Sequence, residues 1–381
     1  MNDKIKTYFR QTPKKAAAFL QSRKDAFCAW THTQSCKNFL FGALKTAIAF
    51  LIAILSSVVV ICISSDSPWE NISIFFLSPF QDAYSLSYVV TQAVPLIFTG
   101  TAVCIMTRCG QFNMFVEGAF YLGAFVSAWL APALRLPFFL LPLVCMLVSA
   151  LVSGAIGYLP AKLKAKLSVN EFVSSLMLNF IVLWVVLYLL HHVVVSDEIY
   201  KTPLLEENMK LPFLDYDNDL SSSILFALGI AVLGGIFLFK TKWGYRIRMT
   251  GDNPAFAEYV GIRTERPVVY SQVIGAGVAG FGGAAFFLGN YYRFDWEALP
   301  QYGFDGFVIA IMANNNPFLV PLASFFLAYL RVGALNMARV GDVPNEVIYI
   351  IQAIIIILFG ATALLKRVRA AMNRQKKEKA C

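Results

Sequence analysis

The sequence has few charged residues. Asp, Glu, Lys and Arg make up 14% of its 381 residues, whereas soluble domains average about 25%. Hydrophobic residues make up 58%. This composition excludes an ordinary soluble domain, and the chain is too long for one or two membrane spans. The net charge of +9 does not indicate nucleic-acid binding, because the basic residues fall in particular loops and tails. We therefore predict an all-α polytopic membrane protein embedded in a lipid bilayer.

Several motifs of chemistry are also missing. The chain has no G-x-x-x-x-G-K-[ST] loop, so it holds no nucleotide-hydrolysing site of that kind. Its cysteines form no C-x-x-C pair, which argues against a zinc site and against a disulfide framework. His191 and His192 are adjacent and point to different helix faces, so we predict no metal site. No Ser-His-Asp or paired-carboxylate arrangement stands out, and we predict that the chain is not an enzyme and carries no cofactor of its own.

A glycine pattern in one apolar run resembles a nucleotide motif. Residues 275–280 match G-x-G-x-x-G, but they do not follow a strand and lack the expected acidic partner. Gly275, Ala279 and Gly283 recur at four-residue spacing, as small residues do where helices approach closely. We interpret this run as a helix-packing surface.

Apolar runs predict about ten membrane spans, each except the eighth near the roughly 17–25 residues that a spanning helix needs. The predicted spans are 41–64, 85–107, 115–133, 136–159, 172–195, 221–240, 268–289, 304–313, 317–338 and 347–365. The alternative for the short run 304–313 is a re-entrant segment.

Charge in the loops sets the orientation. Loops 160–171 and 241–267 are basic, whereas loops 65–84 and 196–220 are mostly acidic. By the positive-inside rule both termini then lie in the cytoplasm. A basic arm, 1–40, precedes the membrane domain, 41–365, and a basic tail, 366–381, follows it. The arm fits either an amphipathic surface helix or a solvated segment, and we expect no removable signal peptide.

The stretch Gly110 to Gly118 is unusual for a membrane span. It carries Asn113 and Glu117, and a carboxylate at membrane depth normally faces a bundle interior or a water-filled path. The alternative is a solvated position near the membrane edge. Without the first span and the connecting sixth, spans two to five and seven to ten form two units of opposite direction. The third and eighth spans correspond, and the eighth enters through Gly303-Phe304-Asp305-Gly306. Irregular helices at matching places of inverted halves predict a translocation pathway near Glu117 and Asp305.

Four ordered stretches resemble those of a known family. They are Gly110-Gln111-Phe112-Asn113-Met114-Phe115-Val116-Glu117-Gly118, Asn170-Glu171-Phe172-Val173-Ser174-Ser175-Leu176-Met177-Leu178-Asn179, the run from Gly244 to Ile262, and Gly303-Phe304-Asp305-Gly306 with Asn315-Asn316-Pro317. From about residue 85 to 365 the chain resembles the permease subunits of bacterial ABC importers, in the branch of the branched-chain amino acid, ribose and nucleoside systems. The nearest likeness is to simple-sugar and nucleoside permeases, including those of the purine nucleoside and riboflavin type.

The resemblance implies the type II importer permease fold in a bacterial inner membrane. It implies three partners: a cytoplasmic ABC ATPase that hydrolyses ATP, a second permease, identical or different, and an extracytoplasmic substrate-binding protein. It assigns a pathway or gating role to Asn113, Glu117, Glu171, Asn179 and Asp305.

The resemblance also makes loop 241–267 the part that docks on the ATPase. The matching residues are Gly251, Asn253, Pro254, Ala257, Glu258, Tyr259 and Gly261. From the residues alone, Asn253 caps and Pro254 begins a short helix, which Gly261 ends. The alternative is an ordinary basic loop at the membrane surface.

Two functions follow. The first is a permease subunit that takes up a small polar solute, most favourably a nucleoside, with riboflavin and simple sugars also open. Phe115, Val116 and Ala119 depart from the small residues and Gln of the family pattern, so the substrate is not carried over. The alternative is a self-contained, ion-coupled secondary transporter, in which Glu117 and Asp305 relay protons. A scaffold without transport activity has no support beyond the tails.

Overall fold

The computed structural model describes residues 67–134, 136–138, 140–194 and 201–340, with Leu55, Val58, Cys62, Ile350 and Ala353. The chain separates into the units Met1–Ser57 and Val58–Cys381, and every helix and strand below belongs to the second. The basic arm 1–40, the first span 41–64, the last span 347–365 and the tail 366–381 lie outside the described residues, apart from those isolated positions.

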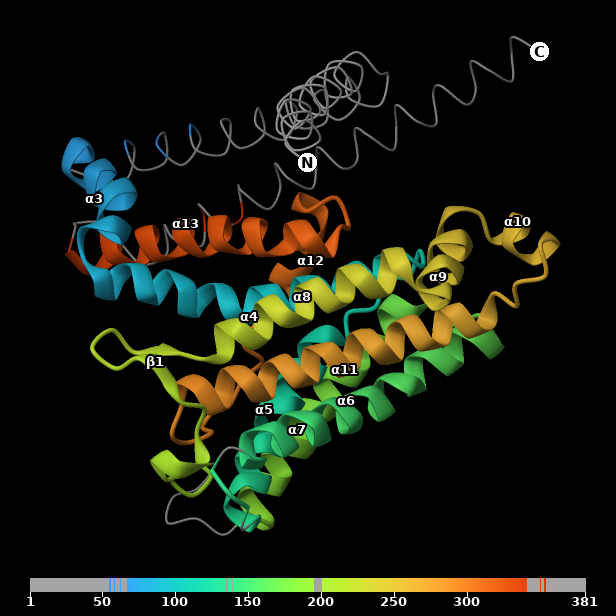
Figure 1. The fold of residues 1–381 in the computed structure, drawn as a ribbon, viewed down its shortest axis with the longest axis horizontal. Coiled ribbons are helices and arrows are strands. Elements are labelled where there is room, and N and C mark those ends of the chain that lie inside the picture. Colours follow the sequence, from blue (N-terminus) through green and yellow to red (C-terminus); the bar gives the residue numbers. More distant parts are fainter. Residues whose placement is uncertain are drawn as a thin grey trace, which may run out of the picture. The chain divides into compact units, whose positions relative to one another are not determined.

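Seven segments within the described ranges are long and apolar enough to cross a membrane. They are α4 (Ala83–Thr107), α5 (Val116–Ala133), α6 (Leu140–Leu167), α7 (Glu171–His192), α8 (Ser223–Lys240), α11 (Glu265–Asn290), and α13 (Val320–Val340) together with the 3-10 turn η2 (Pro317–Leu319) before it (Figure 1). The apolar helix α12 (Tyr302–Met312) is shorter. Each corresponds to one predicted span in the described part of the chain, so the protein is a polytopic α-helical membrane protein.

Three connections differ from the prediction. Helix α6 continues to Leu167 through most of the segment predicted as loop 160–171, because Lys, Ala and Leu are all good helix formers. Helix α3 (Pro68–Gln81) occupies the predicted loop 65–84 and begins with a proline, which suits the first turn of a helix. The predicted loop 196–220 contains the 3-10 turn η1 (Glu207–Met209) and the antiparallel pair β1 (Phe213–Asp215) and β2 (Leu220–Ser221).

Helix α11 packs against α4, α5 and α6, and its glycines permit this close approach. A Cβ on Gly283 would collide with the carbonyl oxygen of Phe120, and one on Gly280 would collide with Ser153. On α5, a Cβ on Gly123 would meet the carbonyl of Gly280. The packing role predicted for this glycine-rich run is confirmed.

The two ends of the bundle carry different structures. Helices α9 (Lys242–Asp252) and α10 (Pro254–Tyr259) lie at one end of the long helices, and the β1–β2 hairpin lies at the other (Figure 1). The hairpin lies in the connection from α7 to α8, and α9 and α10 lie in the connection from α8 to α11. The acidic and basic loops of the sequence are thus at opposite ends of the bundle.

The acidic loop is fastened to the segment that leads into α12. The backbone N–H of Thr202 donates to the Phe294 carbonyl at 3.1 Å, and that of Leu205 donates to the Tyr292 carbonyl at 2.9 Å. The buried Lys210 places its Nζ 3.3 Å from the centre of the Tyr292 ring. Burial lowers the pKa of Lys210 to about 8, although neighbouring carboxylates act in the opposite direction. The acidic loop therefore holds the segment before α12 through backbone hydrogen bonds and through the contact between Lys210 and Tyr292.

Replacement of Gly283 by alanine should destabilise the bundle. The new methyl group would overlap the backbone of α5, and overpacking of a close contact typically costs about 1–3 kcal/mol. Gly229 of α8 is the matched control, because within the described residues nothing beyond its own stretch of helix backbone lies within 4 Å of its Cβ position. There alanine should be neutral or stabilising by up to about 1 kcal/mol through helix propensity. Melting temperatures of the two solubilised variants give the comparison. Equal effects of Gly283→Ala and Gly229→Ala would contradict the packing role.

Candidate functional site

Two stretches of non-helical backbone lie inside the bundle. The first, residues 108–115, separates α4 from α5, and the second, residues 291–301, separates α11 from α12. Helix α12 runs alongside the second half of α4. A Cβ on Gly306 would touch Thr99, and Thr107 Oγ1 lies 2.9 Å from Asn315 Oδ1. Because α4 is long enough to span the membrane, α12 begins near the middle of α4 and is a half-helix. Non-helical backbone at such depth is tolerated only against protein or a water-filled cavity.

The carboxylate of Glu117 joins the two stretches. Its Oε1 accepts from the backbone N–H of Gln301 and its Oε2 from that of Gly303, both at 2.5 Å. These N–H groups belong to the first turn of α12, where helical backbone bonds are not available. A negative charge there also complements the helix dipole. Glu117 is 1% exposed, so its first role is to cap the half-helix.

A second buried charge follows within the same turn. Asp305 Oδ2 accepts from Arg331 Nη2 of α13 at 2.7 Å, and Asp305 is 8% exposed. Removing either partner of a buried ion pair is destabilising, because the remaining charge stays desolvated and unpaired. This pair ties α12 to α13. The sequence prediction did not include Arg331, although a lone arginine in the apolar run 317–338 calls for a buried partner.

Side chains of α7 hold the first non-helical stretch. Ser175 Oγ accepts from the Met114 N–H at 2.9 Å. Asn179 accepts from the Gly118 N–H and donates to the Met114 carbonyl, each at 3.0 Å. A Cβ on Gly118 would meet the Asn179 side chain. The predicted motif around Asn179 therefore positions the predicted motif around Glu117.

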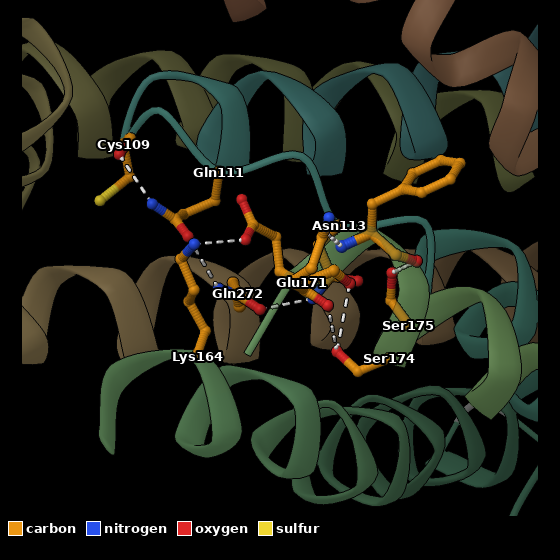
Figure 2. Close-up of polar contacts among 10 residues, drawn as sticks. Cys109, Gln111, Asn113, Lys164, Glu171, Ser174, Ser175 and Gln272 are labelled. Carbon is orange, nitrogen blue, oxygen red and sulfur yellow. Dashed lines mark hydrogen bonds and ion pairs between the residues drawn. The ribbon is translucent and has the colours of Figure 1, made fainter. Parts of the chain in front are cut away.

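A chain of amides completes the lining of this stretch (Figure 2). Asn113 Nδ2 donates to Gln272 Oε1 of α11 at 2.5 Å, and Gln272 Nε2 donates to Gln111 Oε1 at 3.4 Å. Glu171, at the start of α7, pairs with Lys164 Nζ at 2.7 Å. Figure 2 places this ion pair beside the amides. Gln272 was also missed from the sequence, where a glutamine in the run 268–289 was the available signal.

All four resembling stretches meet at the junction of α4 and α5. Arg108 Nε donates to the Asn315 carbonyl at 2.7 Å. A Cβ on Gly251, from the third stretch, would collide with the Arg108 carbonyl oxygen, and a Cβ on Gly110 would lie 3.6 Å from the Gly251 Cα. Gly110 itself has φ +75°, a left-handed conformation that favours glycine. The matched residues therefore form one structural centre rather than four separate ones.

The predicted pathway residues are thus mostly interior to this subunit. Asn113 and Asn179 are each 1% exposed, like Glu117. The polar side chains Asp295, Glu297 and Gln301 are exposed in the second break. Three exposed phenylalanines, Phe112, Phe172 and Phe304, lie at or beside the breaks. Phe112 stacks on Phe172 with ring centres 5.7 Å apart and packs on Phe307 at 4.5 Å. We name Phe112, Phe172 and Phe304 the aromatic patch.

The predicted short helix in loop 241–267 is present as α10. Asn253 Oδ1 accepts from the Phe256 N–H at 3.1 Å, Pro254 is the first helical residue, and Gly261 has φ +87°. Its cap, start and stop are therefore confirmed. Ala257 is buried, and Glu258 Oε1 accepts from Thr264 Oγ1 at 2.7 Å.

Tyr259, the last residue of α10, is 90% exposed. Its side chain therefore projects into solvent from the end of α10 and is accessible to a partner.

The sequence of this chain is similar to those of known transport permeases. A family described as the permease component of the branched-chain amino acid transport system matches residues 85–360. A guanosine ABC transporter permease of Bacillus subtilis is 31% identical over 87% of this chain and 97% of the relative. A glucose ABC transporter permease of Haloferax volcanii is 30% identical, covering 80% of this chain and 83% of the relative. A nucleoside ABC transporter permease of Lactococcus lactis is 25% identical, covering 85% and 92%. No solved structure matches the chain.

The chain therefore belongs to the family of branched-chain amino acid-type transport permease components. It is a multi-pass membrane subunit of an ABC transporter and not an enzyme, as the sequence predicted.

Replacement of Glu117 by glutamine should destabilise the fold by about 1.5–3 kcal/mol, the usual worth of hydrogen bonds to a charged group. Glutamine offers one acceptor where the two N–H groups of Gln301 and Gly303 need two, and its NH2 would face a donor. Glu206→Gln, at an exposed carboxylate of the acidic loop, is the control. Thermal unfolding of solubilised protein should show a lower midpoint for Glu117→Gln only. An unchanged midpoint would contradict the capping role.

Proposed function

We propose that this chain is the permease subunit of an importer for nucleosides. The observation that carries the proposal is the site itself: a half-helix capped by Glu117 meets a second helix break beside the exposed aromatic patch. Broken helices at matching positions are where transporters bind and pass their substrates. Two of the similar permeases are named for guanosine and nucleoside transport, and aromatic rings stack well on nucleobases. Riboflavin and simple sugars are the runner-up substrates.

In this proposal the path lies between two permease subunits, this chain and a second copy or a related chain. Asn113, Glu117, Glu171, Asn179 and Asp305 shape the path by fixing the breaks, while the aromatic patch contacts the solute. Exposed Phe112 and Phe304 lie on the surface that a second subunit would cover. Large aromatic side chains contribute strongly to such contacts. The two inverted four-helix units and the total of about ten spans belong to the same proposal.

The proposal also sets the orientation in the cytoplasmic membrane of a bacterium. Both termini, the arm 1–40 and the tail 366–381 face the cytoplasm, with the membrane domain 41–365 between them, as the basic loops require. ATP is hydrolysed by a separate ABC ATPase, and an extracytoplasmic protein delivers the solute. Lys242 and Arg246 of α9 then lie on the cytoplasmic side with α10.

The ion-coupled carrier is the alternative function. It would need Glu117 or Asp305 to exchange protons with the path. Glu117 is engaged by two backbone N–H groups, and Asp305 is paired with Arg331. Both carboxylates are therefore buried and engaged by partners inside the subunit, whereas a proton relay needs carboxylates that are open to the path. Family membership also favours the ATP-driven system.

Uptake of labelled guanosine by cells that lack this chain tests the proposal. Guanosine uptake should fall to background on deletion and return with the wild-type chain, and unlabelled nucleosides should compete better than glucose or riboflavin. ATP depletion should stop uptake, whereas a protonophore applied at constant ATP should not. Normal guanosine uptake without the chain, or arrest by the protonophore alone, would overturn the proposal.

The same assay tests the aromatic patch. Phe112→Leu keeps an apolar side chain but removes the ring, so half-saturation for guanosine should rise about tenfold, within the 1–3 kcal/mol of a base–aromatic stack. Phe138→Leu, at an exposed phenylalanine away from the breaks, is the matched control. Equal half-saturation in both variants would remove the patch from the binding site.

Replacement of Tyr259 by alanine should uncouple the permease from its ATPase. Tyr259 is 90% exposed, so its loss should leave folding intact while removing a large contact of α10. An exposed tyrosine at the centre of an interface commonly contributes 2 kcal/mol or more, which corresponds to about a thirtyfold weaker association. Tyr216→Ala, at a 76% exposed tyrosine of the opposite loop, is the control. Co-purification of the ATPase with tagged permease provides the measurement, and equal recovery from both variants would refute docking through α10.

A further inference from the structure

A basic cavity lies beside α10, at the same end of the bundle. Its volume is about 660 Å³. Five cationic side chains line it, against one carboxylate, Glu265. The cations are Lys162, Lys166, Arg246, Arg263 and Arg266. They come from α6, from α9 and from the residues around the start of α11. In the sequence these residues belong to the basic loops 160–171 and 241–267.

Salt bridges among the described residues do not neutralise the cavity cations. All five are exposed, and in the part of the chain that the structure describes none of them forms a salt bridge. Lys164 on the same helix does find a carboxylate, Glu171, so an acidic partner was available nearby but is used elsewhere. Five like charges around one cavity repel one another unless an anion occupies it.

The wall of the cavity is aromatic as well as basic. Trp243 and Tyr270 pack edge to face with ring centres 4.8 Å apart, and the Tyr270 hydroxyl donates to the Trp243 carbonyl at 3.2 Å. Lys162 Nζ lies 5.4 Å from the centre of the Tyr158 ring. Tyrosine and tryptophan beside basic residues are typical of the level of lipid headgroups. The cavity therefore combines the side chains found at a membrane interface.

An apolar track leads along α6 to the cavity. Leu147, Leu151, Ala155 and Tyr158 are exposed at spacings of three or four residues, so they share one helix face. Lys162 continues this face, and Lys166 ends it. The 28 residues of α6 extend about 42 Å, whereas the hydrocarbon core is about 30 Å thick. The basic end of α6 thus reaches the headgroup level when its apolar part lies in the core.

We propose that this cavity binds the headgroup of an anionic phospholipid, with an acyl chain along the apolar track of α6. Basic pockets between membrane helices on the cytoplasmic side suit such headgroups. The inference rests on the proposed orientation, in which this end faces the cytoplasm. An acidic segment of the ATPase is the competing occupant, but it would leave the apolar track without a role. The bound lipid would bridge α6 and α9 next to the helix that docks the ATPase.

The test uses the full-length chain with its co-purifying partners in mild detergent. Native mass spectrometry measures binding of dioctanoyl phosphatidylglycerol, with dioctanoyl phosphatidylcholine and inorganic phosphate as separate probes. The double variant Lys162→Gln/Arg266→Gln removes two cavity cations. Lys240→Gln/Lys242→Gln removes the same charge from the same end of the bundle, outside the cavity lining.

Phosphatidylglycerol should bind the wild-type and control proteins alike. Its affinity for the cavity variant should fall roughly 25-fold, since each basic residue at a membrane surface contributes about a fivefold factor. Raising the salt concentration should weaken binding to the wild type, and the neutral lipid should not bind.

Three outcomes would overturn the proposal. Competition by inorganic phosphate at the concentrations effective for phosphatidylglycerol would make the site one for free anions. Equal weakening in both double variants would mean non-specific attraction. Unchanged lipid binding with loss of the ATPase from the cavity variant alone would make the cavity a protein contact. Lipid binding in detergent does not depend on which solute is transported, so failure here leaves the uptake test unaffected.

Discussion

The structure depends on how non-helical backbone is satisfied inside a membrane protein. In hydrocarbon an unpaired N–H or carbonyl costs several kcal/mol, and no water is present to pair with it. Glu117 meets this requirement for the start of α12, and Asn179 and Ser175 meet it for the stretch before α5. Without these side chains, the backbone groups that they bind in the two breaks would lose their partners.

This requirement separates two kinds of residue at the site. The polar side chains of the resembling stretches are largely buried and bonded to backbone, so they maintain the shape of the breaks. Phe112, Phe172 and Phe304 remain exposed beside them. In the proposed importer, specificity for a solute would therefore change at Phe112 or Phe304 without disturbing Glu117.

The sequence predicted most of what depends on local chemistry. Asn253, Pro254 and Gly261 marked the ends of α10 because capping, ring geometry and positive φ act within a few residues. Apolar runs located the long helices for a similar reason. The boundary at residue 160 was wrong, because hydropathy marks where the apolar stretch ends and not where the helix ends. Leu167 is helical although the segment before it is basic.

Long-range partners could not be read from local pattern. Glu117 was recognised as unusual, but its partners were not. Its carboxylate binds backbone N–H groups, which carry no sequence signature, and the first of them is 184 positions away. Arg331 and Gln272 were visible as polar residues in apolar runs. Pairing them with Asp305 and Asn113 required the packing of α12, α13 and α11 against α4 and α5.

The contact between Gly110 and Gly251 has a mechanical consequence. Main chain touches main chain there, with no side chain between the helix break and the end of α9, two residues before α10 begins. A partner that displaces α10 would shift residues 108–110 through this direct backbone contact, without any exchange of charges or hydrogen bonds. Such a backbone contact does not depend on which solute is transported. One kind of ATPase could then drive pathways for quite different solutes, with only the side chains that line the pathway exchanged.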